Sequence, residues 1–399
     1  MADFEKKLER ECPICHSGYG TVLGRLHFAL FDDCPLSKNF DVVACRDCSF
    51  VFYDTPDKAD QYAIFYSNHY FSSGYTSASQ IASVDAVVNI ENDPLAIMRP
   101  WLKSESRICE IGCGRGALLA KMKEAGYTNI YGVEPSNDCV EFVRKNLGIE
   151  AKVGTADNIP FDGQFEVIIC THVLEHVLNP GEAAESISRK LSDNGLAYIE
   201  VPDLEGYDSL DQASPLDYIT FYEHINHFTI SSLTNLFKRY KLCLIEFGRK
   251  TLNEGARLPI PAVYGVFEKN GTEGRIESTF NASYDIDKIR NWFSTYKFQK
   301  NDKLQELAES KTPVYIWGIN LPIQKLLSMS SLRECNIVGL LDRDPSKQQK
   351  TINGTKIQDP EILKTADSRS VMVIWGGPYR ESIEQDIQRI GFKGEIIIL

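Results

Sequence analysis

The stretch Arg107–Gly116, RICEIGCGRG, decides the fold of the middle of this 399-residue chain. An apolar segment, which predicts a short buried strand, leads there into three glycines, Gly112, Gly114 and Gly116. Glycine permits positive φ in a tight turn and lets a ligand approach the backbone closely. The helix predicted over 117–125 begins with N–H groups that have no partner inside the helix. The stretch therefore predicts a strand, a turn and a helix that together bind a ligand at the turn.

Strands and helices alternate around this turn. The apolar runs predict strands over 107–111, 129–133, 165–170 and 196–201, and helices over 117–125, 139–147 and 181–191. Strands that alternate with helices of this length form a parallel sheet covered on both faces. We therefore expect a Rossmann-like α/β domain over residues 76–299, entered by a helix over 86–101.

A second alternation occupies residues 300–399. A long polar helix is predicted over 285–310, and strands are predicted over 314–317, 337–341, 371–375 and 395–399. We expect a separate Rossmann-like α/β domain there. Asp342 ends one of these strands and is a candidate nucleotide-binding residue, while a degenerate scaffold without a ligand is the alternative.

Four cysteines near the N-terminus form two CxxC pairs, Cys12 with Cys15 and Cys45 with Cys48. This spacing lets both thiolates of a pair reach one tetrahedral ion. The unusually long segment between the pairs adds only about 0.5 kcal/mol of loop-closure cost, which is small beside zinc binding. We therefore expect a zinc-binding module over 1–75 that holds a structural ion, because four thiolates leave no open position for catalysis. His16 and Cys34 are substitute ligands, and four unligated thiols are the alternative.

Composition limits the classes of partner. The net charge is -12, with 55 Asp and Glu against 43 Lys and Arg, which argues against nucleic acid and anionic membranes as partners. Residues 1–10 lack the apolar core of a signal peptide, and we find no run of about 18 apolar residues that would span a bilayer. We expect a cytoplasmic protein whose partner is a small molecule, with monomer and homodimer both open.

Acidic side chains at strand ends indicate which ligand the glycine turn binds. Glu110 precedes the turn, where a carboxylate would repel a pyrophosphate but suits the cationic amino-acid end of S-adenosylmethionine. Glu134 ends the next strand, where an acid accepts hydrogen bonds from ribose hydroxyls. Asp157 is placed to accept a hydrogen bond from the adenine amino group. Thr171 and His172 follow the fourth strand at the same edge and are further candidate cofactor-binding residues. Taken one at a time, a glycine can simply form a turn and an acid can simply face solvent. Together, these residues favour an S-adenosylmethionine site.

The segment 221–228, FYEHINHF, is dense in groups that move protons or hold a sugar near neutral pH. It contains Tyr222, Glu223 and His224, followed by a second histidine, His227. The alternative is that such histidines are satisfied structural residues. We take the first three as candidate catalytic residues.

Residues Glu110–Gly116, Glu134 and Leu174–His176 resemble class I S-adenosylmethionine-dependent methyltransferases. The resemblance extends over residues 105–205. It implies the methyl donor and leaves the acceptor open.

The whole chain resembles bacterial sugar C-methyltransferases, which modify nucleotide-linked 4-keto-deoxysugars. The order of two CxxC pairs, methyltransferase domain, Glu-His-x-x-x-Phe segment and Rossmann-like tail is the same, and YFSSG at 70–74 matches as well. In that family the residues that match Tyr70, His176, Glu223 and His224 line the substrate site. His224 matches the usual candidate base.

This resemblance implies a mechanism with two variants. For methylation at carbon, His224 takes the proton beside a keto group, Glu223 orients the imidazole, and Tyr70 or His176 stabilises the enolate. For methylation at oxygen, the same histidine takes a hydroxyl proton.

Two departures from the family leave the acceptor open. The family usually has Tyr-His where this chain has Phe221-Tyr222, and the turn at 317–322 in the tail differs as well. We predict a methyltransferase for a nucleotide-linked deoxysugar, with carbon as the acceptor atom. The alternatives are an O-methyltransferase for a component of a surface polysaccharide or natural product, and a degenerate methyltransferase that serves as a binding protein.

Overall fold

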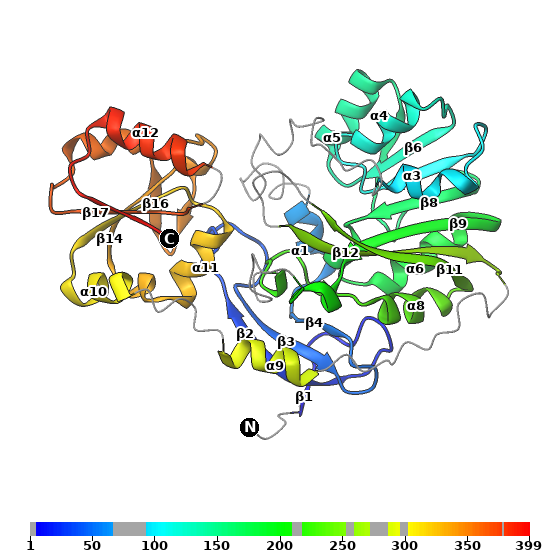
Figure 1. Ribbon diagram of the computed structural model, residues 1–399, viewed down its shortest axis with the longest axis horizontal. Helices are drawn as coiled ribbons and strands as arrows, with labels where there is room; N and C mark the ends of the chain where they lie inside the picture. Colours follow the sequence, from blue (N-terminus) through cyan, green and yellow to red (C-terminus); the bar gives the residue numbers. More distant parts are fainter. Residues whose placement is uncertain are drawn as a thin grey trace. The chain divides into compact units, whose positions relative to one another are not determined.

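The structure is a computed structural model that describes residues 5–66, 93–209, 218–252, 259–271, 286–295, 302–376 and 379–399. The chain divides into two compact units (Figure 1). The first unit comprises Met1–Gly24, Asp41–Ala59 and Ile81–Arg290, and the second comprises Arg25–Phe40, Asp60–Gln80 and Asn291–Leu399. The segment expected as an N-terminal module is thus shared between the two units.

A seven-stranded sheet forms the centre of the first unit, in the order β11-β12-β9-β8-β5-β6-β7. Its strands are β5 (Ile108–Ile111), β6 (Ile130–Glu134), β7 (Glu150–Val153), β8 (Phe165–Thr171), β9 (Leu191–Pro202), β11 (Leu242–Leu252) and β12 (Ile260–Lys269). The strands from β5 to β9 pair in parallel, which confirms the predicted Rossmann-like α/β fold. Antiparallel pairing adds β12 to β9 and β11 to β12, two strands that the sequence patterns did not reveal.

Helices accompany this sheet. They are α3 (Pro94–Met98), α4 (Ala117–Glu124), α5 (Asn137–Phe142), α6 (Pro180–Lys190) and α8 (Ile230–Lys238), whereas α9 (Ile286–Thr295) spans the division between the two units. A π-helical turn continues α5 to Leu147, and 3-10 turns occupy Arg99–Trp101, Leu174–His176 and Leu204–Gly206. The predicted helix over 86–101 is described only from residue 93. The predicted helix over 285–310 is described as α9 and a second helix, with 296–301 outside the described residues.

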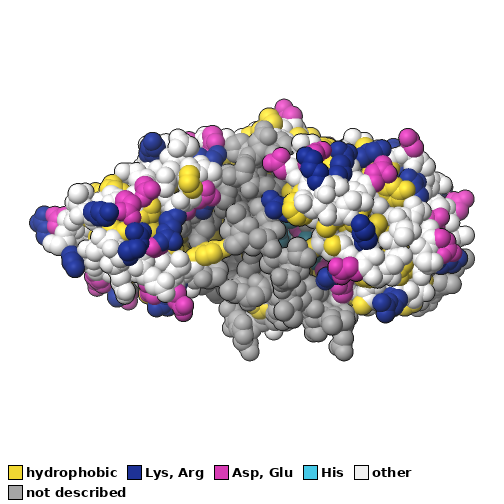
Figure 2. Space-filling model, turned by 90° about the horizontal axis from the view of Figure 1, so that it is seen from above, with side chains coloured by type: hydrophobic (Ala, Val, Ile, Leu, Met, Phe, Trp, Pro, Cys, Tyr) yellow, Lys and Arg dark blue, Asp and Glu magenta, His cyan; other side chains and the backbone are white. Residues whose placement is uncertain are grey.

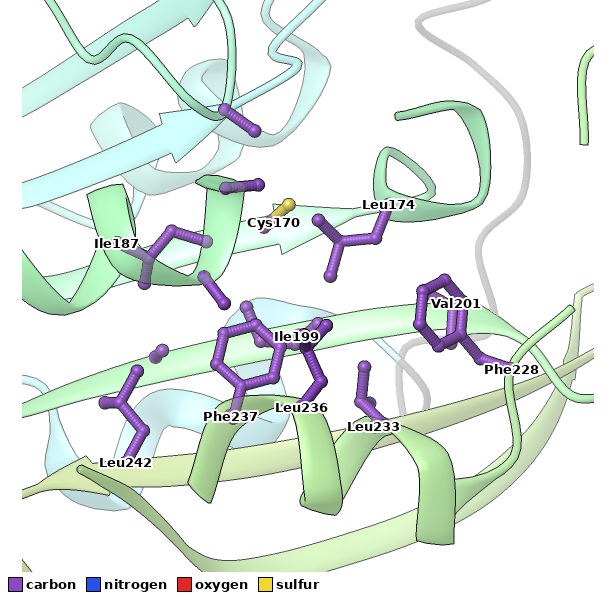
Figure 3. Packing of buried hydrophobic residues seen from close by; sticks show 14 of the residues in the cluster. Cys170, Leu174, Ile187, Ile199, Val201, Phe228, Leu233, Leu236, Phe237 and Leu242 are labelled. Carbon is purple, nitrogen blue, oxygen red and sulfur yellow. The ribbon is translucent and has the colours of Figure 1, made fainter. Parts of the chain in front are cut away.

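The core beside the sheet lies under α6 and α8. Thr229 and Ser232 form a reciprocal capping box that starts α8, which satisfies N–H groups left free at the helix start. Leu233, Leu236 and Phe237 of this helix point toward the sheet (Figure 3). Such burial of large apolar side chains contributes most of the stability of a domain, at about 25 cal/mol per Å² of apolar surface.

A smaller sheet has the order β1-β2-β3-β4-β10. Its strands are β1 (Glu5–Lys7), β2 (Tyr19–His27), β3 (Asn39–Cys45), β4 (Val51–Asp54) and β10 (Asn226–His227). Strand β10 comes from the FYEHINHF segment and pairs antiparallel with β4, with Asn226 opposite Phe52 and His227 opposite Val51. The cysteine-bearing sheet therefore positions the histidine segment.

The second unit has a six-stranded sheet in the order β15-β16-β14-β13-β17-β18. Its strands are β13 (Pro313–Trp317), β14 (Asn336–Leu341), β15 (Thr351–Ile352), β16 (Thr355–Gln358), β17 (Val371–Ile374) and β18 (Glu395–Ile398). Its helices are α1 (Ala59–Ile64), α10 (Asp302–Ser310), α11 (Leu321–Met329) and α12 (Arg380–Ile390), with 3-10 turns at Ser331–Glu334, Lys347–Gln349 and Pro360–Thr365. All pairs except β15 with β16 are parallel, as the second alternation predicts.

The segment 25–40 belongs to the second unit through specific contacts. Ala29 donates its N–H to the carbonyl of Gln324, and Asp32 accepts the N–H groups of Asn353 and Gly354 at 3.0 and 2.9 Å. Phe31 is fully buried. The segment 25–40, which connects β2 and β3, therefore packs with the C-terminal sheet.

The surface carries both charge signs. On the face shown in Figure 2, Lys and Arg side chains lie among Asp and Glu side chains of the described residues. Within the described ranges, we find no helix that combines the length and apolar character needed to cross a bilayer.

Candidate active site

The order of the large sheet creates a switch point between β5 and β8. From β5 the chain proceeds to β6 and β7 on one side, and then returns to add β8 and β9 on the other. Ligands of open parallel sheets bind outside the carboxyl ends of the strands at such a point. Glu110 on β5 and Thr171 at the end of β8 flank this crevice.

The glycine turn after β5 is required by packing and leaves one side open. Gly112, Gly114 and Gly116 have φ of +73°, +51° and +79°, which favour glycine. A Cβ at Gly112 would lie 2.3 Å from Val173, and one at Gly116 would lie 2.7 Å from Leu147. Among the described residues, a Cβ at Gly114 would meet no atom within 4 Å. A ligand therefore has access to the turn at Gly114.

Glu134 closes the crevice beside this turn. Its carboxylate is buried and accepts the N–H of Gly114 and the N–H of Ser136, both at 3.0 Å. Burial raises the pKa of Glu134 although these two hydrogen bonds oppose the shift. Each oxygen has a further lone pair, so the carboxylate can still accept a ribose hydroxyl.

Glu110 is the buried acid without a full set of partners. It is 5% exposed, and its Oε2 has no hydrogen-bond partner among the described residues. Burial, followed by the nearby charge of Glu134, raises the pKa of Glu110 well above its usual value. A buried carboxylate in this state gains from a cationic partner. A cationic group would therefore find a partner in Glu110, and the predicted one is the amino group of S-adenosylmethionine.

The remaining predicted cofactor residues lie along the same edge. Asp157 is exposed in the turn after β7, and Thr171 is partly buried at the end of β8. His172 follows with a φ of +52°, a backbone conformation uncommon for a residue other than glycine.

Both ring nitrogens of His172 face carboxylates. Nδ1 lies 3.2 Å from Glu175 and Nε2 lies 3.1 Å from Glu200. Glu200 also pairs with the buried Lys250 at 2.7 Å. Burial would lower the pKa of His172, but the two carboxylates outweigh it and raise the pKa to about 10. Both nitrogens of His172 are therefore engaged within the chain, and they fix Glu175 and Glu200 in place.

His176 and His224 meet although they come from different elements. Their ring centroids are 4.8 Å apart in an edge-to-face arrangement. Nδ1 of His176 lies 3.0 Å from the carbonyl oxygen of Glu223, 47 positions along the chain. Burial lowers the pKa of both histidines, that of His224 well below its usual value. The structure thus brings together His176, Glu223 and His224, three of the residues predicted to line the substrate site.

Two other residues of the histidine segment are buried. His227 is buried against Tyr207 and Tyr53, and burial lowers its pKa to about 3. Tyr222 is buried as well. Tyr70, the fifth predicted catalytic residue, lies outside the described residues.

Asn226 is the residue that sequence reasoning missed. It is 1% exposed, and its amide donates to the carbonyls of Leu174 and Val177 at 2.9 and 2.7 Å. Its carbonyl accepts Arg10 at 2.8 Å. Asn226 therefore ties the turn that carries His176 to the cysteine-bearing sheet. An asparagine within FYEHINHF was visible in the sequence, but no spacing rule indicated its partners.

The four predicted zinc ligands form one cluster. One sulfur atom from each of Cys12, Cys15, Cys45 and Cys48 lies within 4.8 Å of the other three. The residue after each pair, His16 or Ser49, adopts the left-handed conformation and donates its N–H to the carbonyl of the pair's first cysteine. The two pairs are thus similar knuckles, and this donor set suits tetrahedral zinc. Neither His16 nor Cys34 belongs to this cluster of described residues.

Asp342 in the second unit has a structural role. Its carboxylate accepts the N–H groups of Ile319 and Asp344 at 2.9 and 3.0 Å and pairs with Lys347. These bonds hold the turn after β13 against the turn after β14. A nucleotide would have to share an acid that is already engaged.

Comparison with known proteins identifies the central part of the chain. Residues 91–246 match the family model described as a methyltransferase domain. This part of the chain is a methyltransferase domain. The glycine turn, the two acids Glu110 and Glu134, and strands β5 to β9 lie within the matched range. Strand β11 begins within it, and β12 follows it.

Three known proteins illustrate the similarity. The C-methyltransferase NovU from Streptomyces niveus is 25% identical over 279 residues, which are 64% of this chain and 61% of that protein. The ubiquinone biosynthesis O-methyltransferase from Rickettsia prowazekii is 29% identical over 24% of this chain and 40% of that protein. A solved S-adenosylmethionine-dependent methyltransferase from Methanosarcina mazei is 18% identical, with a TM-score of 0.39, and the match covers 43% of this chain and 96% of that one. The chain thus aligns with about half the length of the curated relatives it matches.

Proposed function

We propose that the chain transfers the methyl group of S-adenosylmethionine to a nucleotide-linked deoxysugar that carries a keto group, with carbon as the acceptor atom. The observation that carries methyl transfer is the open glycine turn between two buried acids, Glu110 and Glu134, within a methyltransferase domain. Glu110 would hold the cationic amino group, and Glu134 would accept the ribose hydroxyls.

The acceptor would bind beside His176 and His224. Val173 packs on Gly112 of the cofactor turn, and the 3-10 turn Leu174–His176 follows directly. The histidine pair is therefore adjacent to the turn that would hold the methyl donor. Methyl transfer needs in-line approach and exclusion of water, and the short connection through Val173 would fix both groups relative to each other.

The protein must also remove a proton from the acceptor. His224 would take it as the base, since its imidazole lies against His176 at the candidate substrate site. Glu223 would orient this imidazole, and His176 with Tyr70 would stabilise the enolate oxygen. Bound S-adenosylmethionine supplies the electrophilic methyl group and leaves as the thioether.

Sugar C-methylation draws support from the extent of one similarity. The alignment with the C-methyltransferase NovU covers 64% of this chain, well beyond the methyltransferase domain. O-methylation is the second candidate, because Phe221-Tyr222 departs from the sugar C-methyltransferase pattern and an O-methyltransferase is among the relatives.

The cysteine cluster would hold one structural zinc ion. Its role would be to fix β4, on which β10 and the histidine segment depend. We expect one tightly held zinc ion in the purified protein, and its loss in a Cys45→Ser variant. A Cys243→Ser variant, which changes a cysteine outside the cluster, should retain the ion. Full zinc content in Cys45→Ser would contradict the assignment.

Incubation with labelled S-adenosylmethionine and a panel of nucleotide sugars, with and without a 4-keto group, tests the acceptor. We expect label in the keto sugars alone, and NMR of the product should place the methyl group on carbon. Label in sugars that lack the keto group, on oxygen, would favour the second candidate. No label in any sugar would contradict a sugar acceptor.

Calorimetry tests the donor site separately. Glu110→Gln should weaken S-adenosylmethionine binding at least about tenfold, because the buried cation loses its charged partner. Glu150→Gln is the matched control, since this exposed glutamate lies at the start of β7, away from the carboxyl ends. Equal affinities in the two variants would contradict the role of Glu110.

A further inference from the structure

A second group of metal-binding side chains lies apart from the four cysteines. Glu175, His176 and His224 each offer one ligand atom, and these atoms lie within 4.8 Å of one another. The Glu175 side chain is 1% exposed and that of His176 is 16% exposed. Two imidazoles and a carboxylate in a largely buried position are a donor set that binds divalent transition metals.

A backbone carbonyl orients the ring of His176. A carbonyl oxygen can only accept a hydrogen bond, so the contact between Nδ1 of His176 and the oxygen of Glu223 assigns the proton to Nδ1. Nε2 then carries a lone pair, and it lies 3.9 Å from Oε1 of Glu175. Histidines that bind metals commonly donate their other N–H to a carbonyl in this way.

Glu175 is held by one oxygen and lacks a partner at the other. Its Oε1 faces Nδ1 of His172, and His172 is anchored in turn by Glu200. Its Oε2 has no hydrogen-bond partner among the described residues. A buried carboxylate oxygen without a partner is costly, and a bound cation would remove that cost.

We propose that Glu175, His176 and His224 bind one divalent transition-metal ion. The three protein ligands come from the 3-10 turn after β8 and from the histidine segment, and they leave coordination positions open. This distinguishes the site from the cysteine cluster, where four thiolates complete the shell. An ion of the zinc, iron, cobalt or manganese class suits the two imidazoles better than magnesium or calcium does.

The consequence of the ion for catalysis rests on the proposed function, whereas its binding does not. With the keto oxygen of the acceptor at an open position, the neighbouring carbon would lose its proton more readily, because the ion would stabilise the negative charge of the enolate. In the metal-loaded protein His224 would be a ligand, so the proton would pass to a water molecule, and His224 would serve as the base only in the metal-free protein.

Metal analysis of the full-length protein tests the site without donor or acceptor. After equilibration with Co²⁺ and gel filtration, we expect two ions per chain in the wild type. Glu175→Gln and His224→Ala should each retain one ion, and Cys48→Ser should lose the other. His27→Ala, which changes an exposed histidine far along the sequence, is the matched control and should keep two. One ion per chain in the wild type, unchanged in Glu175→Gln, would overturn the proposal.

The cobalt spectrum keeps the test decisive if a variant does not fold. Cobalt bound to thiolates gives an intense sulfur-to-metal absorption, while cobalt bound to nitrogen and oxygen gives weak visible bands. We expect both signatures in the wild type, and only the thiolate signature after substitution of Glu175. A wild-type spectrum with thiolate absorption alone would overturn the proposal. A protein that binds two ions but methylates nothing would leave the metal site standing and contradict the proposed function instead.

Discussion

Gly112 and Gly114 share one turn, but their surroundings differ. Gly112→Ala should lower the free energy of unfolding by about 3 kcal/mol, because the added Cβ meets Val173 and also adopts a left-handed conformation. The added Cβ of Gly114→Ala meets no atom of the described part of the chain within 4 Å, so only the backbone strain of about 1 kcal/mol should remain. Urea unfolding of both variants measures the difference.

The variants Gly112→Ala and Gly114→Ala also separate the effect on stability from the effect on S-adenosylmethionine binding. The Cβ of Gly114→Ala would occupy the open side of the turn, so this variant should bind S-adenosylmethionine more weakly than its small loss of stability suggests. Equal losses of stability in the two variants would contradict the packing argument. Unchanged affinity in Gly114→Ala would contradict the position of the cofactor.

Asn226 is a residue-scale test of how the histidine segment is held. Asn226→Ala should cost about 3 kcal/mol of stability, because it removes three hydrogen bonds, to two carbonyls and to Arg10, at a buried position. Asn146→Ala removes a single hydrogen bond at an exposed position and should cost less than about 0.5 kcal/mol. Denaturant unfolding of both variants checks this, and similar small losses would show that Asn226 does not tie the two segments together.

At the scale of elements, one strand pair joins two features that are far apart in the sequence. The sequence predicts the cysteine pairs and the FYEHINHF segment separately, and nothing in either pattern relates them. The pairing of β4 with β10 places them in one sheet. A zinc ion in the cysteine cluster would therefore stabilise the position of His224 from a distance, through the strand and the bonds of Asn226.

The contact that Asp32 of the segment 25–40 makes within the second unit should be sensitive to acid. Partial burial would raise the pKa of Asp32, but the N–H groups of Gly354 and Asn353, with Thr351 and Lys38, lower it to about 2. A carboxylate with a lowered pKa in the folded state stabilises the fold above its ordinary pKa near 4, and this contribution is lost as the pH falls toward 2. Asp32→Asn should thus be less stable at pH 7 by about 1 kcal/mol, a value reduced because the side chain is one-third exposed.

Unfolding by denaturant at pH 7 and near pH 2 measures this contribution. The difference between wild type and Asp32→Asn should disappear at the lower pH. Asp33→Asn is the matched control, because Asp33 is 53% exposed and its surface ion pair with Lys350 contributes little. A loss in Asp32→Asn that stays constant with pH would contradict the role of the charge.

At the scale of the molecule, the chain consists of two compact units, each with its own sheet and core. The glycine turn and both acids belong to the first unit. A ligand stabilises the unit that binds it by about 2.7 kcal/mol when its concentration is one hundred times the dissociation constant. S-adenosylmethionine should therefore raise the midpoint of one of two transitions in differential scanning calorimetry.

The second transition is the internal control of this experiment. It belongs to the C-terminal sheet and should keep its midpoint when S-adenosylmethionine is added. Glu110→Gln should reduce the shift of the first transition. A shift of both transitions by the same amount would contradict the assignment of the cofactor to the first unit.

The sequence by itself determined the strand–turn–helix unit at 107–125, the parallel alternation on either side of it and the cysteine pairs. Each of these depends on neighbours in the chain: apolar periodicity, the dihedral freedom of glycine, and the short spacing of two thiols. The acids Glu110 and Glu134 could be found for the same reason, since they end predicted strands. Tyr70 stays a prediction.

Only the tertiary structure decided which distant side chains meet. Strand order and register brought His176 to His224, placed β10 against β4 and added the antiparallel strands β11 and β12. His172 illustrates the limit most clearly, because its position at a strand end gave no sign of its two carboxylate partners, Glu175 and Glu200. A side chain's role depends on what packs against it, and packing is set by contacts between segments that no local pattern relates.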